Sequence, residues 1–442
     1  MAKFTPHTEN EVKEMLEVIG VKKVDDLFND ISKELRPKSF SLPSGKTEYE
    51  VKEIFETLAN KNKNLILFAG AGYYDHFVPA AIDAITSRAE FYTAYTPYQP
   101  EASQGTLQAI FEYQTAISRL TGLPYSNASL YDGGTALYEA IAMAVRTNAR
   151  QRILIDAGVN PIFVNIVKTY IINLSLNIEI IDLKDFHCDK ETMKSKLDES
   201  ISCIVVQNPN FFGFIDDYEE LFKIAKEKNI CCISVFNPVS LSILKTPGEM
   251  CADIAVAEGQ SLGMDLCFGG PYLGILATTK DYLRKMPGRI VGKTIDKNGK
   301  ECFVLTLQAR EQHIKREKAT SNICSNQALC ALRAVVYLSL LGKNGFKNLG
   351  LLNLQKTEEL KSKLKEIKAI EVIKGDTFNE FPIKIKQPIN NIVNKMLEKN
   401  ILAGVPASLF YKNMQDILII SVTEKRTDNE LYRFVEELKK IV

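Results

Sequence analysis

Short apolar runs alternate with amphipathic segments through the middle of the chain. The apolar runs, bounded by Gly, Pro or Asn, predict buried strands, and the segments between them carry apolar residues at helical spacing. Strands that are linked by crossover helices form a mainly parallel sheet covered on both faces, so the pattern predicts an α/β fold. We expect strands at 152–156, 178–183, 201–209, 230–238 and 253–257, and helices at 161–171, 191–200 and 218–228.

The N-terminal residues 1–63 show helical patterns without strands. Thr8 with Glu11 and Thr47 with Glu50 have the spacing of a capping box, in which a hydroxyl and a carboxylate accept hydrogen bonds from backbone N–H groups at a helix start. We therefore expect a helical arm here.

The rest of the chain predicts two further parts. A large domain at 64–307 begins with an apolar strand at 65–69 and contains the alternating strands and helices. An interface segment and a smaller α+β domain follow at 308–442. The interface segment begins with a charged run at 308–318 that we interpret as a solvated or interface helix, and an amphipathic helix is expected at 326–341.

The composition fits a globular protein with a large core. The chain has 442 residues, of which 45% are hydrophobic, and this length favours two domains plus appendages. Its 55 basic and 54 acidic residues leave a net charge of +1, which argues against attraction to nucleic acid or acidic membranes through bulk charge. No apolar run approaches the ~20 residues that span a bilayer, and no signal-peptide pattern opens the chain, so we expect a soluble cytoplasmic protein.

The nine cysteines are scattered without CxxC pairs or histidines at ligand spacing. Such thiols in a reducing compartment are usually reduced and structural. We therefore expect no metal site and no catalytic cysteine.

Two loops carry candidate binding chemistry. Asp132, Gly133, Gly134 and Thr135 precede a strong helix pattern, where glycines allow close backbone approach and the helix N-terminus attracts a phosphate. Capping of the helix by Asp132 or Thr135 explains the same residues equally well. The tyrosine loop, residues 91–105, holds aromatic residues among prolines and suits a binding edge, with a rigid turn over the core as the alternative.

Long motifs appear in the order known from one family: FYTAYTPYQPEASQG, NASLYDGGTALYEA, GQSLG with CFGGPYLGILA, and LQAREQHIKREKATSNICSNQAL. Together they make the chain similar to the P-proteins of the glycine cleavage system, in the form divided between two subunits, and to the first subunit of that form. The resemblance implies the fold of the pyridoxal phosphate (PLP)-dependent transferases of fold-type I, which is aminotransferase-like. It also implies an α2β2 complex in which subunit 2, and not this chain, holds PLP.

The resemblance implies an activity as well, that of glycine dehydrogenase (aminomethyl-transferring). Glycine loses its carboxylate as CO2, and the aminomethyl group passes to the lipoyl group of the H-protein, the co-substrate. In this family's cofactor-binding subunit a Schiff-base lysine follows the strand that matches 253–257. This chain has Ser261 at that position, Gln260 at the position of a neighbouring histidine, and Asn237 where an aspartate is expected to pair with the cofactor ring. Lys245 and Lys280 are out of register. The resemblance therefore implies that no catalytic residue acts on this chain alone and that residues 132–135 are a vestigial phosphate loop.

The expected contribution of this chain lies at the subunit interface. By position, Tyr95, Tyr98 and Glu101 are candidates for a wall that faces glycine or the lipoyl arm. Thr320, Ser321 and Asn322 are candidates for donors to the phosphate of the cofactor on subunit 2. Both segments could equally well only pack the interface. An independent PLP-dependent lyase or aminotransferase and a non-catalytic scaffold remain as alternative functions.

Overall fold

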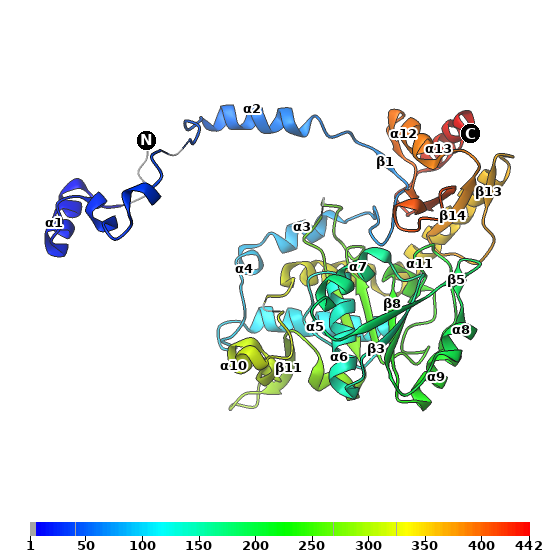
Figure 1. Ribbon diagram of the computed structural model, residues 1–442, viewed down its shortest axis with the longest axis horizontal. Coiled ribbons are helices and arrows are strands. Elements are labelled where there is room, and N and C mark those ends of the chain that lie inside the picture. Colours follow the sequence, from blue (N-terminus) through cyan, green and yellow to red (C-terminus); the bar gives the residue numbers. More distant parts are fainter. Residues whose placement is uncertain (1–5, 40, 268, 324) are drawn as a thin grey trace. The chain divides into compact units, whose positions relative to one another are not determined.

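The computed structural model describes residues 6–39, 41–267, 269–323 and 325–442. Its backbone divides into two compact units, Met1–Lys63 and Asn64–Val442. Figure 1 shows the elements of each unit. Cys324, and Phe268 of the CFGGPYLG motif, lie outside the described residues.

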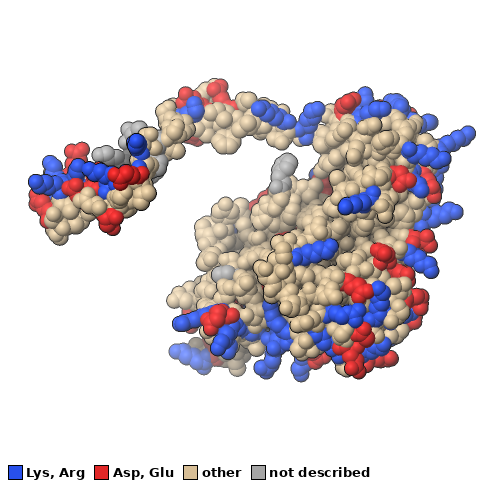
Figure 2. Space-filling model, in the orientation of Figure 1, with Lys and Arg blue, Asp and Glu red and all other residues tan. Residues whose placement is uncertain are grey.

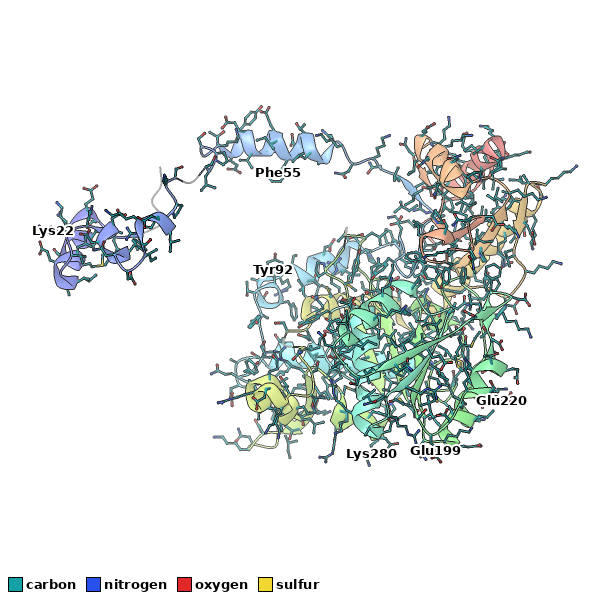
Figure 3. The ribbon with its side chains drawn as sticks, in the orientation of Figure 1. Lys22, Phe55, Tyr92, Glu199, Glu220 and Lys280 are labelled. Atoms are coloured by element: carbon teal, nitrogen blue, oxygen red, sulfur yellow. The ribbon has the colours of Figure 1, made fainter. Side chains whose placement is uncertain are left out.

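The N-terminal unit is helical, as its capping signals predict. It contains α1 (Glu9–Ile19), the 3-10 turns η1 (Val24–Phe28) and η2 (Lys33–Leu35), and α2 (Glu48–Ala59). Both capping boxes are confirmed, at Thr8 and at Thr47. Helix α2 buries none of its side chains, and its Phe55, labelled in Figure 3, is 65% exposed. The apolar side chains of α2 are exposed, so the helix presents an uncovered apolar face. A helix of this length is only marginally stable without packing.

The second unit is built on a seven-stranded sheet of order β2-β10-β9-β8-β7-β3-β4. The strands from β9 through β4 in this order pair in parallel, and β10 is antiparallel to both of its neighbours. The predicted, mainly parallel α/β sheet is thereby confirmed. The strand bounds are β2 Tyr125–Ser126, β3 Arg152–Asp156, β4 Asn177–Ile181, β7 Ile201–Asn208, β8 Cys231–Phe236, β9 Ile254–Glu258 and β10 Gly274–Thr278.

Helices cover both faces of this sheet (Figure 1). On one face α6 (Gly133–Asn148) and α7 (Pro161–Ile171) pack against alternate strand residues, with Ile141 and Phe163 in the core. On the other, α8 (Lys190–Ser195) and α9 (Glu219–Glu227) bury Met193 and Phe222. The period-two pattern of the strands places successive apolar residues in these two cores. Other elements around the sheet are α3 (Ala80–Thr86), α4 (Ala89–Tyr92), α5 (Gln104–Thr121), η3 (Val239–Ser242), η4 (Lys280–Lys285) and the hairpins β5–β6 (Leu183–Lys184, His187–Cys188) and β11–β12 (Ile290–Ile295, Glu301–Thr306).

The C-terminal part holds a four-stranded sheet of order β13-β14-β17-β16. Helix α11 (Ala328–Lys365) leads into it and has a break at Gly342, whose φ of 57° and ψ of −175° are not helical. The helix predicted at 326–341 therefore ends at this break, and a second helix follows the kink. The remaining bounds are β13 Ile370–Val372, β14 Glu380–Ile385, α12 Ile389–Glu398, β15 Ile401–Leu402, β16 Val405–Pro406, η7 Ala407–Leu409, β17 Ile417–Ser421 and α13 Asp428–Ile441.

Two expectations from the sequence are wrong. The strand expected at 65–69 in the large domain is β1 (Ile66–Leu67), which pairs in parallel with β15 of the C-terminal part. The ring of Phe68 packs 4.2 Å from that of Phe434, so this segment buries its apolar side chains in the C-terminal core. The helix expected at 308–318 is a series of short turns, because the run lacks the apolar stripe that would pack a continuous helix. These turns are η5 (Gln308–Arg310), α10 (Gln312–Lys315) and η6 (Arg316–Lys318).

The capping box of α13 gives a local test of stability. The Thr427 hydroxyl accepts from the Glu430 N–H at 3.2 Å, and the Glu430 carboxylate accepts from the Thr427 N–H at 2.8 Å. We expect Thr427→Ala to lower the free energy of unfolding by about 1 kcal/mol, because helix N–H groups lose their acceptor. Urea unfolding followed by circular dichroism measures the change. Thr47→Ala removes the matching box of α2 in the other unit and should leave the main transition unchanged; an equal loss in both variants would contradict the assignment.

Candidate functional site

A segment of the chain covers the carboxyl ends of the parallel strands, where ligands of such sheets bind. This covering segment, residues 70–76, is held from two strands. The Asn160 side chain, just after β3, donates to the Ala71 carbonyl at 2.9 Å. The Gln260 side chain, just after β9, accepts from the Tyr74 N–H at 2.9 Å and donates to the Tyr74 carbonyl at 3.0 Å. The backbone of the covering segment thus occupies the expected ligand edge.

Glu380 of β14 fixes the covering segment from the C-terminal part. Its carboxylate accepts from the Ala71 N–H and from the Tyr74 hydroxyl, both at 2.6 Å. Burial raises the pKa of Glu380 to about 7, and burial together with this neighbouring carboxylate raises the pKa of Tyr74 well above its usual range. A Cβ at Gly70 would lie 2.2 Å from the Glu380 carboxylate, so only glycine allows this approach.

Glu258, the last residue of β9, occupies the N-terminus of α6. Its carboxylate accepts from the N–H groups of Gly133 at 3.0 Å, Gln260 at 3.0 Å and Leu273 at 3.1 Å. Burial raises the pKa of Glu258 to about 8, despite the lowering effect of these donors. The carboxyl oxygens of Glu258 therefore take the N–H groups at the helix N-terminus, where an external anion would otherwise bind.

The predicted phosphate loop at 132–135 has the geometry of a helix cap. Asp132 accepts from the Thr135 N–H at 2.8 Å and from its hydroxyl at 3.0 Å. A Cβ at Gly133 would lie 2.6 Å from the Phe163 ring, and one at Gly134 would lie 2.4 Å from Ile166. Close packing therefore accounts for both glycines.

The residues present do not fit PLP. Ser261 is 3% exposed, has no amine with which to form an imine, and its hydroxyl has no hydrogen-bond partner among the described residues. Asn237, after β8, carries no charge and instead accepts from the Val239 N–H at 3.0 Å and donates to Asn379 at 3.2 Å. Lys245 pairs at 3.0 Å with Asp217 on the surface, and Lys280 is exposed (Figure 3). Ser261 and Asn237 therefore lack the amine and the carboxylate that a covalently anchored PLP needs.

The two segments proposed for the interface lie together. In the tyrosine loop, the Tyr95 hydroxyl is 3.3 Å from that of Ser325, and the Tyr98 ring centroid is 5.4 Å from that of His313. Tyr95 is 78% and Tyr98 51% exposed, and Glu101 is also exposed. Tyr92, labelled in Figure 3, is 69% exposed at the start of the loop. We call this surface, made by residues 92–101, 308–323 and 325–327, the tyrosine face.

Thr320, Ser321 and Asn322 line a pocket of about 160 Å³ together with Thr135 and Glu139. The Ser321 hydroxyl donates to the Glu139 carboxylate at 2.6 Å, and the Asn322 side chain accepts from Gln312 at 3.3 Å. Burial raises the pKa of Glu139. Glu139 was not among the predicted site residues. Its position as an acidic residue within the apolar helix pattern ALYEAIAMA could have indicated it.

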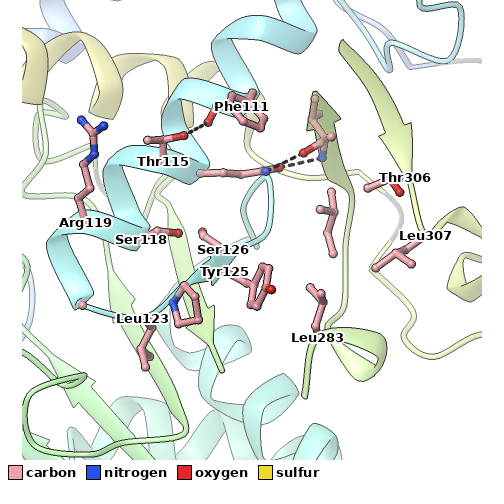
Figure 4. A pocket seen from close by; sticks show the side chains of 16 residues that line it. Phe111, Thr115, Ser118, Arg119, Leu123, Tyr125, Ser126, Leu283, Thr306 and Leu307 are labelled. Carbon is pink, nitrogen blue, oxygen red and sulfur yellow. Dashed lines mark hydrogen bonds between the residues drawn. The ribbon is translucent and has the colours of Figure 1, made fainter. Parts of the chain in front are cut away.

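A larger pocket lies elsewhere and was not predicted. It measures about 820 Å³ between α5 and the β11–β12 hairpin (Figure 4). Gln114 crosses it, accepting from the Val291 N–H at 2.9 Å and donating to the Val291 carbonyl at 3.0 Å. Arg119 is the one charged side chain among the described residues that line it. This groove holds no set of groups for acid–base or nucleophilic chemistry.

Other kinds of site find no support in the geometry. On the face that Figure 2 shows, basic and acidic side chains are interspersed. Among the described residues, no group of His, Cys, Asp and Glu side chains could hold a metal ion. No helix in the described part of the chain is long and apolar enough to cross a membrane.

Solved structures with little sequence similarity share the fold. A NifS-like protein from Rickettsia africae has a TM-score of 0.64 at 15% identity, covering 85% of this chain and 99% of its own. Glutamate decarboxylase from Lactobacillus brevis has a TM-score of 0.69 at 14% identity, covering 94% and 97%. The chain therefore has the fold of the PLP-dependent transferases of fold-type I.

Similar sequences extend over the whole chain. Probable glycine dehydrogenase (decarboxylating) subunit 1 of Geotalea daltonii is 50% identical over 437 residues, which is 99% of each chain. The protein of the same name from Maridesulfovibrio salexigens is 48% identical over 438 residues, also 99% of each. A crystal structure of glycine decarboxylase (P-protein) of the glycine cleavage system, in inhibitor-bound form, has a TM-score of 0.91 at 37% identity and covers 100% of both chains. The family described as Glycine cleavage system P-protein matches residues 2–438, and the chain belongs to this family.

Proposed function

We propose that the chain is one of two kinds of subunit of a glycine decarboxylase. The complex removes the carboxylate of glycine as CO2 and transfers the aminomethyl group to the lipoyl group of the H-protein. The full-length similarity to proteins named glycine dehydrogenase (decarboxylating) subunit 1 supports this reaction. The word subunit in those names supports a second chain, and we propose an α2β2 complex.

One observation carries the role of this chain within the complex. It keeps the fold of a PLP enzyme, but its own residues fill the strand edge where the cofactor would lie. Glu380 and Gln260 hold the covering segment there, and Glu258 takes the N-terminus of α6. PLP therefore belongs to the second subunit, and this chain completes that subunit's site.

We propose the tyrosine face as the contributing surface. Tyr95, Tyr98 and Glu101 form the wall that faces glycine or the lipoyl arm, because they are exposed on one loop. Phenol groups offer both an apolar ring and a hydrogen-bonding tip at such a surface.

Thr320, Ser321 and Asn322 are the proposed donors to the cofactor phosphate of the second subunit. They line one pocket within the tyrosine face, which supports a shared task. Ser321 donates to Glu139 in this chain, so its hydroxyl must turn to the phosphate on assembly. Among the described residues, the Thr320 hydroxyl has no such hydrogen bond to exchange, and we expect it to contribute first.

We propose that the chain has three parts. Residues 1–63 act as an arm, 64–307 as the large domain apart from β1, which joins the small domain, and 308–442 as the interface segment with the small domain. The uncovered apolar face of α2, made by Val51, Phe55 and Leu58, supports an arm that packs on the second subunit. Exposed apolar patches of this kind mark interaction surfaces.

The proposal is tested by reconstitution. Purified alone with PLP, the chain should show no pyridoxyl-lysine after borohydride reduction and no exchange of bicarbonate into glycine. Addition of the second subunit and lipoylated H-protein should restore exchange, because the two chains form the site together. A pyridoxyl group trapped on Lys245 or Lys280 would instead indicate an independent PLP enzyme. Full exchange by the second subunit without this chain would leave it only a scaffold.

A further inference from the structure

Arg289 is a buried cation beneath an exposed ring. It lies just before β11 and is 4% exposed. Its guanidinium carbon is 5.6 Å from the centroid of the Tyr98 ring, and Nη2 is 3.5 Å from the Tyr98 hydroxyl oxygen. In the described part of the chain, the other side-chain hydrogen-bond partner of Arg289 is the neutral Asn326, whose Oδ1 lies 3.5 Å from Nη1, and Nε has none.

A buried charge without an acidic partner is costly, so an arginine is normally exposed to water or paired with a carboxylate. The contact with the ring offsets part of this cost, since a guanidinium is attracted to an aromatic face. The principal group that the charge of Arg289 acts on is therefore Tyr98.

Tyr98 is held from a second side as well. His313 of α10 meets the ring edge-on, with an interplanar angle of 64°. The ring is half exposed, and a phenol at such a position would otherwise be able to occupy several side-chain rotamers. Arg289 and His313 together select one of them.

We infer that Arg289 is a positioning residue for Tyr98. It fixes the plane of the ring, and by donating to the phenol oxygen it leaves the phenol hydrogen directed away from the protein. The tyrosine face therefore presents Tyr98 as an oriented hydrogen-bond donor. This inference rests on the proposed function only in the statement that Tyr98 acts at the shared site.

The orientation is measured on the full chain alone by fluorine NMR of protein labelled with fluorotyrosine. The chain has 17 tyrosines, and the signal of Tyr98 is the one missing from Tyr98→Leu. In Arg289→Met we expect this signal to broaden and to move toward the position of denatured protein, with the other tyrosine signals unchanged. Arg289→Lys should give the same result, because an ammonium lacks the planar fork of donors. Arg284→Met, at an exposed arginine of η4, is the matched control and should leave the signal in place.

Kinetics of the reconstituted complex supply the second readout. We expect Arg289→Met to lower kcat/KM about 10-fold, a loss typical of a misplaced contact group. It should have no further effect in the Tyr98→Leu background, because residues that act through one group are not additive.

An unchanged Tyr98 signal in both Arg289→Met and Arg289→Lys overturns the inference. A double variant of Arg289→Met and Tyr98→Leu in which the two losses of kcat/KM add also overturns it. If Arg289→Met does not fold, Arg289→Lys keeps the charge and decides alone. If reconstitution fails while the Tyr98 signal changes as expected in the Arg289 variants, the proposed function is contradicted. The orientation of Tyr98 by Arg289 is then still supported.

Discussion

Glu258→Ala is expected to lower the free energy of unfolding by roughly 3–5 kcal/mol. The carboxylate accepts from the backbone N–H groups of Gly133, Gln260 and Leu273, and the whole cluster is buried. Each buried donor that loses its acceptor costs about 1–3 kcal/mol, and alanine supplies none. The midpoint of urea unfolding at neutral pH measures the loss.

Glu199→Ala is the control for this change. Glu199 is exposed on the surface (Figure 3), and its removal should change stability by no more than about 0.5 kcal/mol. A loss below about 1 kcal/mol in Glu258→Ala would mean that water replaces the carboxylate at the α6 N-terminus. That result would reopen the site for an external anion and weaken the assignment of PLP to the second subunit.

Glu380→Gln is expected to flatten the pH dependence of stability. Burial raises the pKa of Glu380 from its ordinary 4.5 to about 7, so the folded chain binds this proton more tightly than the unfolded chain. The stabilisation is fully present below the ordinary pKa and is lost as the pH rises through the folded pKa. The loss is on the order of 3 kcal/mol for the wild-type chain across this window. Glutamine keeps an acceptor for the Ala71 N–H and a donor for the Tyr74 oxygen, but does not titrate.

Urea unfolding at about pH 5 and about pH 8 measures the difference between the two proteins. The titration of Glu258 changes the stability of the wild type and of Glu380→Gln in the same way, so it does not affect the difference between them. Glu199→Gln serves as the isosteric control and should follow the wild type. Parallel curves for Glu380→Gln and wild type would show that Glu380 is ionised throughout in the folded chain.

Local signals in the sequence predicted much of the fold. The strands that became β3, β7, β8 and β9 are short apolar runs, and the capping boxes at Thr8 and Thr47 involve residues close in sequence. Such features depend on neighbours within a few residues, so a pattern can reveal them. The absence of a lysine at Ser261 is likewise visible without a structure.

The contacts that fill the strand edge could not be predicted in the same way. Glu380 and Ala71 are 309 residues apart, and neither has a local pattern that points to the other. The strand β1 looked like a member of the central sheet because an apolar run does not specify which sheet receives it. The run at 308–318 has helix-forming residues but no apolar stripe, so its charge pattern alone did not reveal that it forms short turns. The roles of Tyr95, Thr320 and Ser321 stay predictions because they depend on the second subunit.

The bond between Tyr74 and Glu380 also bears on motion. Enzymes often close one domain over another through a hinge that bends at a few residues. Here the covering segment is hydrogen-bonded to Gln260 on one side and to Glu380 on the other, so bending between them would break buried bonds. Residues 64–442 accordingly form a single compact unit. The covering segment is therefore expected to stay closed over this strand edge, because opening it would break hydrogen bonds to both parts of the unit.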